Sequence, residues 1–467
     1  MSETSPGDRT PEDARQRMHR HVLRGEVDLG VEFARVTRER ALAEGDRALA
    51  AEAAHRTGEL LLEGQRTEDA LDVLRTALEE REGVFGADHA STACTRSFVA
   101  WALWELGRAG AARDTMARSL VALPPEPTQE TRTAVATVYG NAGGLAESQE
   151  RTAQALSHYR RALALHEGCS PPEMLEVASA CVSLATAEEH EGRLDEARAL
   201  LDRALEIRRR ELGEEHLYVA YTLDHLAGNL LGKGDLDAAR RLYEQGAATI
   251  ERCRGPAHHS LSTPLAGLAT IAAMSHDEKG ALELARRAVA VSEASFGAAS
   301  PHVAQPVVLL ATLQATCGRS PALTAPLWRR AAELWLPVHA THGAGLCECF
   351  NNLALCLRAQ GRLHEFLDFA GPVLGRLERD PEASPDLLAA LANALSEAHF
   401  QEGRSREALG LLQRALALSE ARDGPNDPRL LPVLTNLASV LHSLQRGPEA
   451  RECERRIRKL RRRGAWN

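Results

Sequence analysis

The chain of 467 residues is poor in aromatic residues and in long apolar segments. Aromatic residues make up 4% of it, so large rings cannot dominate its core, and abundant alanine and leucine suit closely spaced helices instead. No apolar stretch approaches the roughly 18 residues of a membrane-spanning helix, and residues 1–11 lack the apolar segment of a secretory signal. We therefore expect a soluble, cytoplasmic protein that does not bind a membrane.

Lysine is also scarce, occurring only at Lys233, Lys279 and Lys459, so arginine supplies nearly all of the 56 basic residues. This bias, together with abundant alanine, glycine and leucine, indicates a bacterial genome rich in G and C. The net charge is −9, and acidic and basic residues alternate along the whole chain. Because a nucleic-acid-binding surface is usually basic, we expect no direct nucleic-acid contact.

The nine cysteines are odd in number and scattered, which argues against a disulfide framework. Cys347, Cys349 and Cys356 form the one cluster worth weighing as a metal site. Cys349 and Cys356 could share a helix face, whereas residues two apart point in different directions. No CxxC pair or histidine pair completes a zinc set, so we expect buried free thiols, no metal and no cofactor.

In place of these features the sequence contains a repeat. A small residue, usually alanine, returns every 42 or 43 residues on the second of two helices. A period this steady is typical of helical hairpins stacked in one dimension, each burying its apolar face against its neighbours. The ten positions are Ala70, Ala112, Ala155, Ala197, Ala239, Ala281, Leu323, Phe366, Ala408 and Ala450.

One unit, residues 213–255, illustrates the pattern. Apolar residues at helical spacing predict a first helix that Gly232 and Gly234 end. Asp235 is predicted to cap a second helix that ends near Gly255. Other first helices are predicted to begin at an N-cap oxygen followed by proline. These pairs begin at Ser170, Ser300, Ser384 and Asp427.

The turn between the two helices usually carries a glycine. The glycines are Gly64, Gly107, Gly192, Gly234, Gly318, Gly361 and Gly403. Glu150, His276 and Gln445 replace it in three units, where we expect tighter or less regular turns. Leu323 and Phe366 replace the packing alanine in two units, where we expect a bend or wider helix spacing.

The order Leu226-Ala227, Gly234, Ala239, Tyr243 resembles a tetratricopeptide repeat. The 42-residue period and the segments 212–216 and 351–354 resemble the kinesin light chain subtype. The resemblance covers roughly residues 45–460 and implies an all-α, right-handed α-solenoid of about eleven helix-turn-helix units. No long heptad segment precedes the repeats, so we do not expect assembly with a kinesin motor.

Four segments are expected along the chain. Residues 1–10 are predicted to be disordered, 11–44 to form a degenerate helix pair, 45–450 to form the array, and 451–467 to form a basic capping helix and tail. That last helix could instead be a basic patch for an acidic partner. We favour the cap, because a solenoid needs a polar end.

Catalytic motifs are not found in the sequence. The segment 228–234 lacks the Ser or Thr of a phosphate loop, and His190-Glu191 and His364-Glu365 have no second histidine four residues on. Three histidines recur with the period at the start of first helices, which favours capping or packing over metal binding. They are His216, His259 and His302. We predict that the protein is not an enzyme.

The resemblance implies that first helices line a concave groove, at positions thirteen, ten, six and three residues before the turn glycine. The asparagine at the Asn351 position is implied to hold the backbone of an extended peptide, since an amide both donates and accepts. Trp101 and Trp104 are candidates for a binding hot spot or for burial under the N-terminal helices, and Arg208 is expected on the convex face. The candidate groove residues are Trp101, Trp104, Tyr221, Asp224, Asn351, Arg358, Asn393, Phe400 and His442.

The leading hypothesis is a non-enzymatic scaffold or adaptor that binds a peptide or protein in the concave groove. One alternative is a regulatory subunit that controls a bacterial effector enzyme, such as a protease or nuclease, within a stable complex. Another is a sensor of a peptide or small ligand, although the DNA-binding helices of many such receptors are missing. The single polar groove residues could also be merely solvated or packed between repeats.

Overall fold

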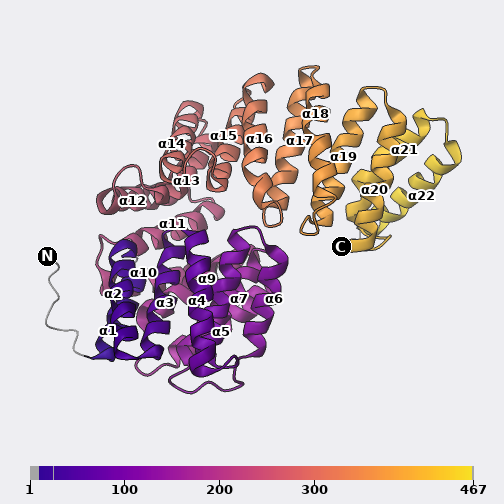
Figure 1. Ribbon diagram of the computed structural model, residues 1–467. Coiled ribbons are helices and arrows are strands. Elements are labelled where there is room, and N and C mark those ends of the chain that lie inside the picture. Colours follow the sequence, from indigo (N-terminus) through magenta and orange to yellow (C-terminus); the bar gives the residue numbers. More distant parts are fainter. Residues whose placement is uncertain (1–9, 25, 465–467) are drawn as a thin grey trace. The chain divides into compact units, whose positions relative to one another are not determined.

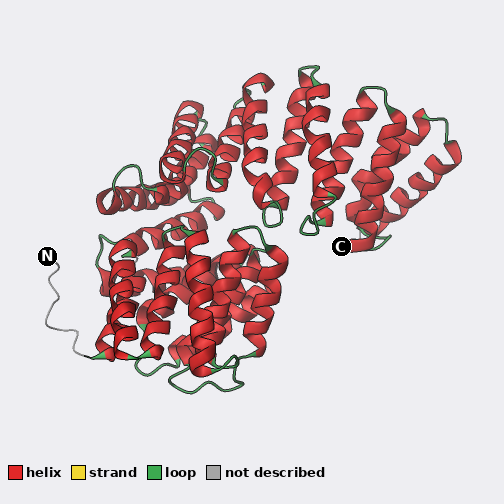
Figure 2. Cartoon of the chain, in the orientation of Figure 1, coloured by secondary structure: helices red, strands yellow, loops and turns green. Residues whose placement is uncertain are grey.

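The computed structural model describes residues 10–24 and 26–464 (Figure 1). Every regular element in these residues is a helix, and Figure 2 shows helices joined by loops without a strand. The 22 α-helices form eleven consecutive pairs, which confirms the all-α solenoid of about eleven units for the described part of the chain. Residues 1–10 are predicted to be disordered. Of these, only Thr10 lies in the part of the chain that the structure describes.

The chain divides into two compact units, residues 1–271 and 272–467. The first unit contains α1 (Pro11–Leu23), α2 (Val27–Glu44), α3 (Arg47–Glu63), α4 (Thr67–Phe85), α5 (Ala90–Glu105), α6 (Ala109–Val121), α7 (Arg132–Glu147), α8 (Thr152–Glu167), α9 (Met174–His190), α10 (Leu194–Leu212), α11 (Leu217–Gly232) and α12 (Leu236–Arg254). The division falls within α13 (Ser262–Met274). No helix of the described residues is both long and apolar enough to cross a membrane.

The second unit continues the same pairing. It contains α14 (Glu278–Phe296), α15 (Ala304–Thr316), α16 (Pro321–Trp335), α17 (Gly343–Ala359), α18 (Leu363–Leu377), α19 (Pro385–Gln401), α20 (Ser405–Asp423), α21 (Leu431–Ser443) and α22 (Gly447–Gly464). Short 3-10 turns precede α13, α15 and α21, and another follows α16. The basic residues near the C-terminus therefore lie on α22, the second helix of the eleventh pair.

The inter-helix turns are more uniform than the sequence suggests. Gly234 has a φ of 81°, and Glu150, His276 and Gln445 adopt the same left-handed conformation with φ between 58° and 60°. In each case the next residue donates its N–H to the carbonyl five residues back, as Asp235 does to Leu230 at 2.9 Å. The prediction of tighter or less regular turns is therefore wrong, because this hydrogen bond fixes the geometry whatever the side chain.

Helix caps follow the sequence in most units. Asp235 accepts a hydrogen bond from the Ala238 N–H at 3.1 Å, and Ser300, Ser384 and Asp427 cap in the same way. The prediction for Ser170 is wrong, because α9 begins only at Met174 after an N-cap at Glu173.

The repeated alanines lie where two helices meet. Ala197 and Ala239 are fully buried, as is Phe366 at the same position of α18. Leu323 is different, since its side chain is 59% exposed in the first turn of α16, where Ala325 is buried instead. Leu323 therefore does not occupy a helix contact, and its size does not separate the helices.

Candidate functional site

The helices of the first unit surround a common interior. His19 of α1 forms a 2.9 Å contact from Nε2 to Glu173 Oε2 at the start of α9. The hydroxyl of Tyr218 in α11 donates to the Val22 carbonyl of α1 at 3.3 Å. These contacts join elements more than 150 residues apart, so the intervening first helices curve around the space between them.

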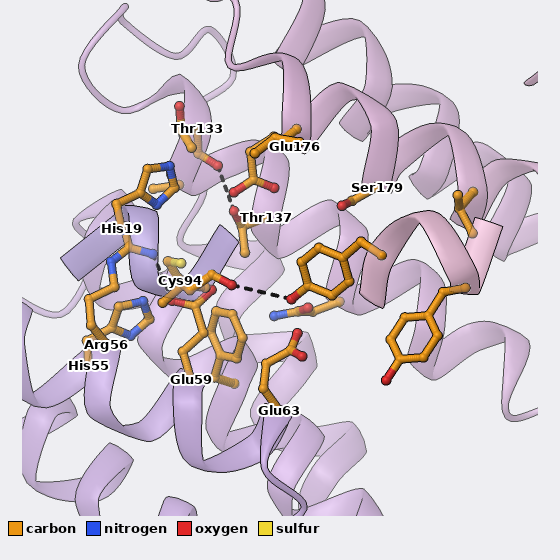
Figure 3. A pocket seen from close by; sticks show the side chains of 18 of the residues that line it. His19, His55, Arg56, Glu59, Glu63, Cys94, Thr133, Thr137, Glu176 and Ser179 are labelled. Carbon is orange, nitrogen blue, oxygen red and sulfur yellow. Dashed lines mark hydrogen bonds and ion pairs between the residues drawn. The ribbon is translucent and has the colours of Figure 1, made fainter. Parts of the chain in front are cut away.

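This interior holds a cavity of about 610 Å³ (Figure 3). Six successive first helices each contribute the residue thirteen positions before the left-handed turn residue. The repeat period itself therefore builds the wall, because one register position points inward in every unit. The six residues are Glu52, Cys94, Thr137, Ser179, Tyr221 and Thr263.

A second cavity of about 530 Å³ shares part of this lining, including Glu59, Glu63 and Tyr221. Trp101 lines it and donates its indole N–H to Glu105 Oε1 at 2.9 Å. Trp104 lines neither cavity and packs against the apolar core around Met116 and Leu145. Trp101 lines the second cavity and Trp104 does not, but both rings are half-buried and pack against the same apolar cluster, which includes Leu62 and Leu103.

Asp224 and Tyr221 both lie in the wall of the first cavity. Tyr221 shares a 2.7 Å hydrogen bond between its hydroxyl and that of Ser260. Asp224 is 6% exposed, and its Oδ1 has no hydrogen-bond partner among the residues described. Burial raises the pKa of Asp224 well above its usual value, so the neutral carboxyl group is favoured there.

One wall of the cavity is a closed network of charges. The Arg56 Nε donates to Glu52 Oε1 at 2.9 Å, and its Nη1 donates to Glu59 Oε2 at 2.7 Å. The guanidinium of Arg81 also pairs with Glu52. Burial opposes the ionisation of Glu52, but Arg81 and Arg56 outweigh it and hold the Glu52 pKa well below its usual range. These charges therefore pair with one another, although the Nε of Arg81 has no hydrogen-bond partner among the described residues.

His55 belongs to the same wall and is 2% exposed. Its Nδ1 lies 3.3 Å from the Thr95 hydroxyl. Burial, reinforced by Arg81 and Arg56, lowers the pKa of His55 well below its usual value. The imidazole is therefore neutral in the folded protein at neutral pH.

Arg208 also lines the cavity, which contradicts its expected place on the convex face. Only 6% of it is exposed, and it contacts Tyr218, Thr222 and Ser179. Burial lowers its pKa to about 10. The convex-face prediction failed because the arginine is long enough to reach from the second helix across to the first helices.

Carboxylates dominate the remaining polar lining. Figure 3 shows Glu59, Glu63 and Glu176 directed into the same space. Desolvation by the surrounding protein and the neighbouring Glu59 raise the pKa of Glu63 to about 6. Glu176, His19 and Glu173 each place one ligand atom within 4.8 Å of the others, a spacing that could hold a metal ion. His19 and Glu173 already satisfy each other there.

The candidates in the second unit lie in a different setting. Asn351, Arg358 and Asn393 line a small pocket of about 210 Å³. Arg358 pairs with Glu397, Nη1 to Oε1, at 2.6 Å. Asn393 accepts a 3.0 Å hydrogen bond from the side chain of Asn436. The pocket is therefore polar, but its charges are paired at the surface.

Two predicted residues lie outside that pocket. Phe400 is half-buried near the end of α19. His442 is exposed on α21, and its Nε2 lies 2.9 Å from Glu454 Oε1 of α22. The structure therefore brings Asn351, Arg358 and Asn393 together and leaves these two apart from them.

Sequence reasoning missed more than one register position of the cavity wall. The position sixteen residues before the left-handed turn residue supplies Ser91, Ala134, Glu176 and Tyr218. The residue nine positions before the left-handed turn residue also faces inward in several first helices. Helical spacing could have revealed it, because a residue four after a groove position shares its face. These residues are Arg56, Phe98, Asn141 and His225.

Comparisons with solved structures give several similar chains. BtubC (BKLC) from P. vanneervenii is 19% identical, with 51% of this chain and 89% of that chain covered at a TM-score of 0.37. A Rap protein complexed with Competence and Sporulation Factor is 12% identical, with 88% and 98% covered at a TM-score of 0.46. The apo form of RapI is 12% identical, with 80% and 99% covered at a TM-score of 0.46. No curated protein matches the chain.

The family model for the tetratricopeptide repeat matches residues 39–122, 176–249, 225–294 and 387–463. Proteins built from this repeat generally act as non-enzymatic scaffolds for protein–protein interaction. The matched segments cover more than half of the sequence and include both units. The chain therefore belongs to the tetratricopeptide repeat family.

Proposed function

We propose that this protein is a non-enzymatic scaffold or adaptor that binds a peptide or protein segment in the cavity of its first unit. The observation that carries the proposal is the wall built by one register position of six successive first helices, from Glu52 to Thr263. Its volume of about 610 Å³ is in the range of sites that hold small ligands or short peptide segments. The mixture of apolar and charged lining suits a peptide.

Within this proposal, Trp101, Tyr221 and Asp224 contact the bound segment. Trp101 supplies a flat apolar surface at the wall of the adjoining cavity, and large aromatic residues often dominate binding energy. Asn351, Arg358 and Asn393 form a second, smaller contact site in the other unit. Trp104, which packs in the core, supports the wall. Phe400 and His442 contribute only if the bound chain extends along α19 and α21.

The proposed setting is the bacterial cytoplasm, and the proposed subtype is the kinesin light chain-like repeat. The regular 42-residue period supports the subtype, and the predominance of arginine over lysine supports a bacterial source. All nine cysteines are free thiols, which suits a reducing compartment.

A sensor of a peptide or small ligand is the alternative that the cavity supports best. Its polar groups are enclosed by a single unit, so a short ligand could contact α3, α5, α9 and α11 at once. A regulatory subunit that controls an effector enzyme remains a second alternative. It predicts a stable complex of fixed stoichiometry with a folded enzyme instead of binding to short peptides.

Selection from a displayed peptide library, followed by filling of the cavity, tests the proposal. Thr137 and Ser179 hold the same register position on the neighbouring first helices α7 and α9, and tryptophan at either position should occlude the space. Peptides selected on the wild-type protein should bind Thr137→Trp or Ser179→Trp at least tenfold more weakly. Arg358→Met tests the second contact site, and the matched control is Arg446→Met, whose exposed arginine pairs with Glu449 and lines neither of these sites.

Thermal melting must first establish that the filled variants fold. If folded filled variants bind the selected peptides as well as the wild type does, the site lies elsewhere. If Arg358→Met alone loses binding, the site lies in the second unit. Selection of a folded enzyme from the native host, with no peptide binding, would favour the regulatory subunit.

A further inference from the structure

The first unit contains two copies of one arginine arrangement. Arg81 near the end of α4 and Arg208 near the end of α10 occupy the same repeat position, three units apart. Each Nη1 donates to the backbone carbonyl ten residues later and to a threonine hydroxyl fourteen residues later. The acceptors are Ser91 and Thr95 for Arg81, at 2.7 and 2.8 Å, and Tyr218 and Thr222 for Arg208, at 3.1 and 2.8 Å.

The copies differ at the other nitrogen of the guanidinium. The Nη2 of Arg81 reaches 29 residues back and pairs with the carboxylate of Glu52. The Nη2 of Arg208 also reaches 29 residues back, but Ser179 stands there and accepts a hydrogen bond at 3.2 Å. No carboxylate of the described residues lies within 4.0 Å of the Arg208 nitrogens. The copy of the arrangement at Arg208 therefore lacks the counter-ion that Glu52 provides at Arg81.

The surrounding side chains change in the same direction. Arg56 and Glu59, which complete the network around Glu52, are replaced three repeats later by Ser183 and Thr186. The second copy therefore keeps the backbone and the arginine but replaces long charged side chains with short hydroxyl-bearing ones. Both copies line the same cavity, the first through Glu52, Arg56 and Glu59 and the second through Ser179 and Arg208.

Arg208 is also unusual in its energetics. It is 6% exposed, and its three hydrogen bonds go to neutral oxygens, although a guanidinium has five N–H donors. A buried charge without a counter-ion is unfavourable, because hydroxyl and carbonyl oxygens replace water only in part. Two donors remain for a group that enters through the cavity.

We infer that Arg208 and Ser179 form a subsite for one carboxylate group of the ligand, which takes the place that Glu52 occupies beside Arg81. The inference rests on the proposed function and names the chemistry of its ligand. A planar carboxylate matches the fork of a guanidinium, and a hydroxyl can donate to the same oxygen.

The groups facing the subsite favour a carboxylate over more highly charged anions. Glu63 faces Arg208 from α3 without reaching it, and Glu59 and Glu176 lie in the same lining. Their negative field disfavours a phosphate, which carries more charge than a carboxylate. His225 of α11 also faces the guanidinium, and burial together with Arg208 lowers its pKa to about 4. It therefore adds no positive charge at neutral pH.

The test uses the full-length chain and defined probes. These are acetate, acetamide and inorganic phosphate, followed by three capped dipeptides: acetyl-Ala-Ala with a free C-terminal carboxylate, acetyl-Ala-Asp-amide and acetyl-Ala-Asn-amide. Binding is measured by ligand-observed NMR and by the shift of the melting temperature at constant ionic strength. Acetate should bind saturably, and acetamide and phosphate should bind at least tenfold more weakly. The two charged dipeptides distinguish a terminal carboxylate from a side-chain carboxylate.

The key variant is Ser179→Glu, which rebuilds the Glu52 arrangement beside Arg208. It should bind acetate at least tenfold more weakly than the wild type and should melt at a higher temperature without ligand. Ser439→Glu adds the same charge at an exposed position of α21, outside the cavity lining, and serves as the matched control. It should leave acetate binding within about threefold. Arg208→Gln should lose acetate binding. It replaces Ser179→Glu as the test variant if Ser179→Glu does not fold.

Equal acetate binding by folded wild-type and Ser179→Glu proteins would overturn the inference, as would no preference for acetate over acetamide. Either result leaves the proposed function standing if selected peptides still lose affinity in Thr137→Trp. If selected peptides bind folded Thr137→Trp as well as the wild type while acetate binding is intact, the proposed function is overturned instead.

Discussion

The two units share one repeat but present different interiors. In the first unit the cavity is lined by charged groups, among them the buried Arg81 and Arg208 of second helices and the half-buried Glu52 of a first helix. In the second unit, the comparable positions form a pocket of about 210 Å³, where Arg358 and Glu397 pair with 43% and 45% of their side chains exposed. The helical frame is therefore independent of what its inner surface carries.

The difference teaches where function is encoded in such an array. Apolar positions repeat in both units because every hairpin must bury the same face against its neighbours. The inward positions are free of that requirement and vary from Glu52 to Tyr221 to Asn393. Buried charges at these positions are costly unless they are paired, so an unpaired one marks a site for a partner.

The largest expected effect is the loss of stability when the arginine of an ion pair is replaced, which should be greater in the cavity wall than at the exposed surface. Arg81→Met should destabilise the first unit by about 1–3 kcal/mol, because it removes one of the two cations beside Glu52 and the donor to the Ser91 carbonyl and the Thr95 hydroxyl. Arg358→Met should change stability by less than about 1 kcal/mol, since that pair is exposed. Chemical denaturation measures both. A similar loss in the two variants would remove the distinction between the interiors.

The two tryptophans sharpen the contrast between wall and core. Trp101→Ala should weaken binding of a selected peptide by about 2 kcal/mol, because the ring lines the second cavity. It should also lower the melting temperature, because the ring packs against the cluster that includes Leu62 and Leu103. Trp104→Ala should mainly lower stability, because its ring packs beside Met116. Calorimetry and thermal melting separate the outcomes. Unchanged affinity in folded Trp101→Ala would remove it from the site.

Helix packing should respond locally. Ala197→Trp should cost about 1–3 kcal/mol through overpacking at a fully buried helix contact. Leu323→Trp at the same repeat position should change stability by about 0.5 kcal/mol or less, because that side chain is 59% exposed. Hydrogen exchange should show lost protection near α9 and α10 in the first variant only. Protection lost throughout the chain would contradict nearest-neighbour coupling.

Acid should weaken the first unit through His55. Its folded-state pKa lies well below 6.5, so below that pH the unfolded chain takes up a proton that the folded chain refuses. Stability then falls by up to about 1.4 kcal/mol per pH unit. His55→Gln should flatten this slope between pH 6.5 and 5. Asp224 and Glu63, whose pKa values are raised, act in the opposite direction and remain in both proteins. Identical slopes would assign the acid sensitivity to other groups.

Much of the fold was predictable because its determinants repeat. The 42-residue period gave the helix pairs, and Asp235 and Ser384 gave their caps. The turn at Glu150 was not predictable from residue preference, because a backbone hydrogen bond decides its conformation. Leu323 shows that a register position need not be a packing position at the first turn of a helix.

The candidate site was predictable only in part. Tyr221, Asp224 and Trp101 follow from the groove positions that the resemblance to a tetratricopeptide repeat implies, and all three line a cavity. Arg208 could not be placed, since its long side chain leaves the second helix and its role depends on Ser179, 29 residues earlier. A comparison of the repeats would have suggested this role once it was known that the arginine contacts the residue 29 positions earlier, which is Glu52 for Arg81 and Ser179 for Arg208.

Hydrogen exchange of the full-length chain, with and without a selected peptide, tests the central claim most directly. The account predicts slowed exchange in the first helices of the first unit, especially in α3, α9 and α11 around Glu52, Ser179 and Tyr221. It predicts little change in α17 and α19 of the second unit. Protection confined to α17, α19 or the basic α22, with the first unit unaffected, would contradict it.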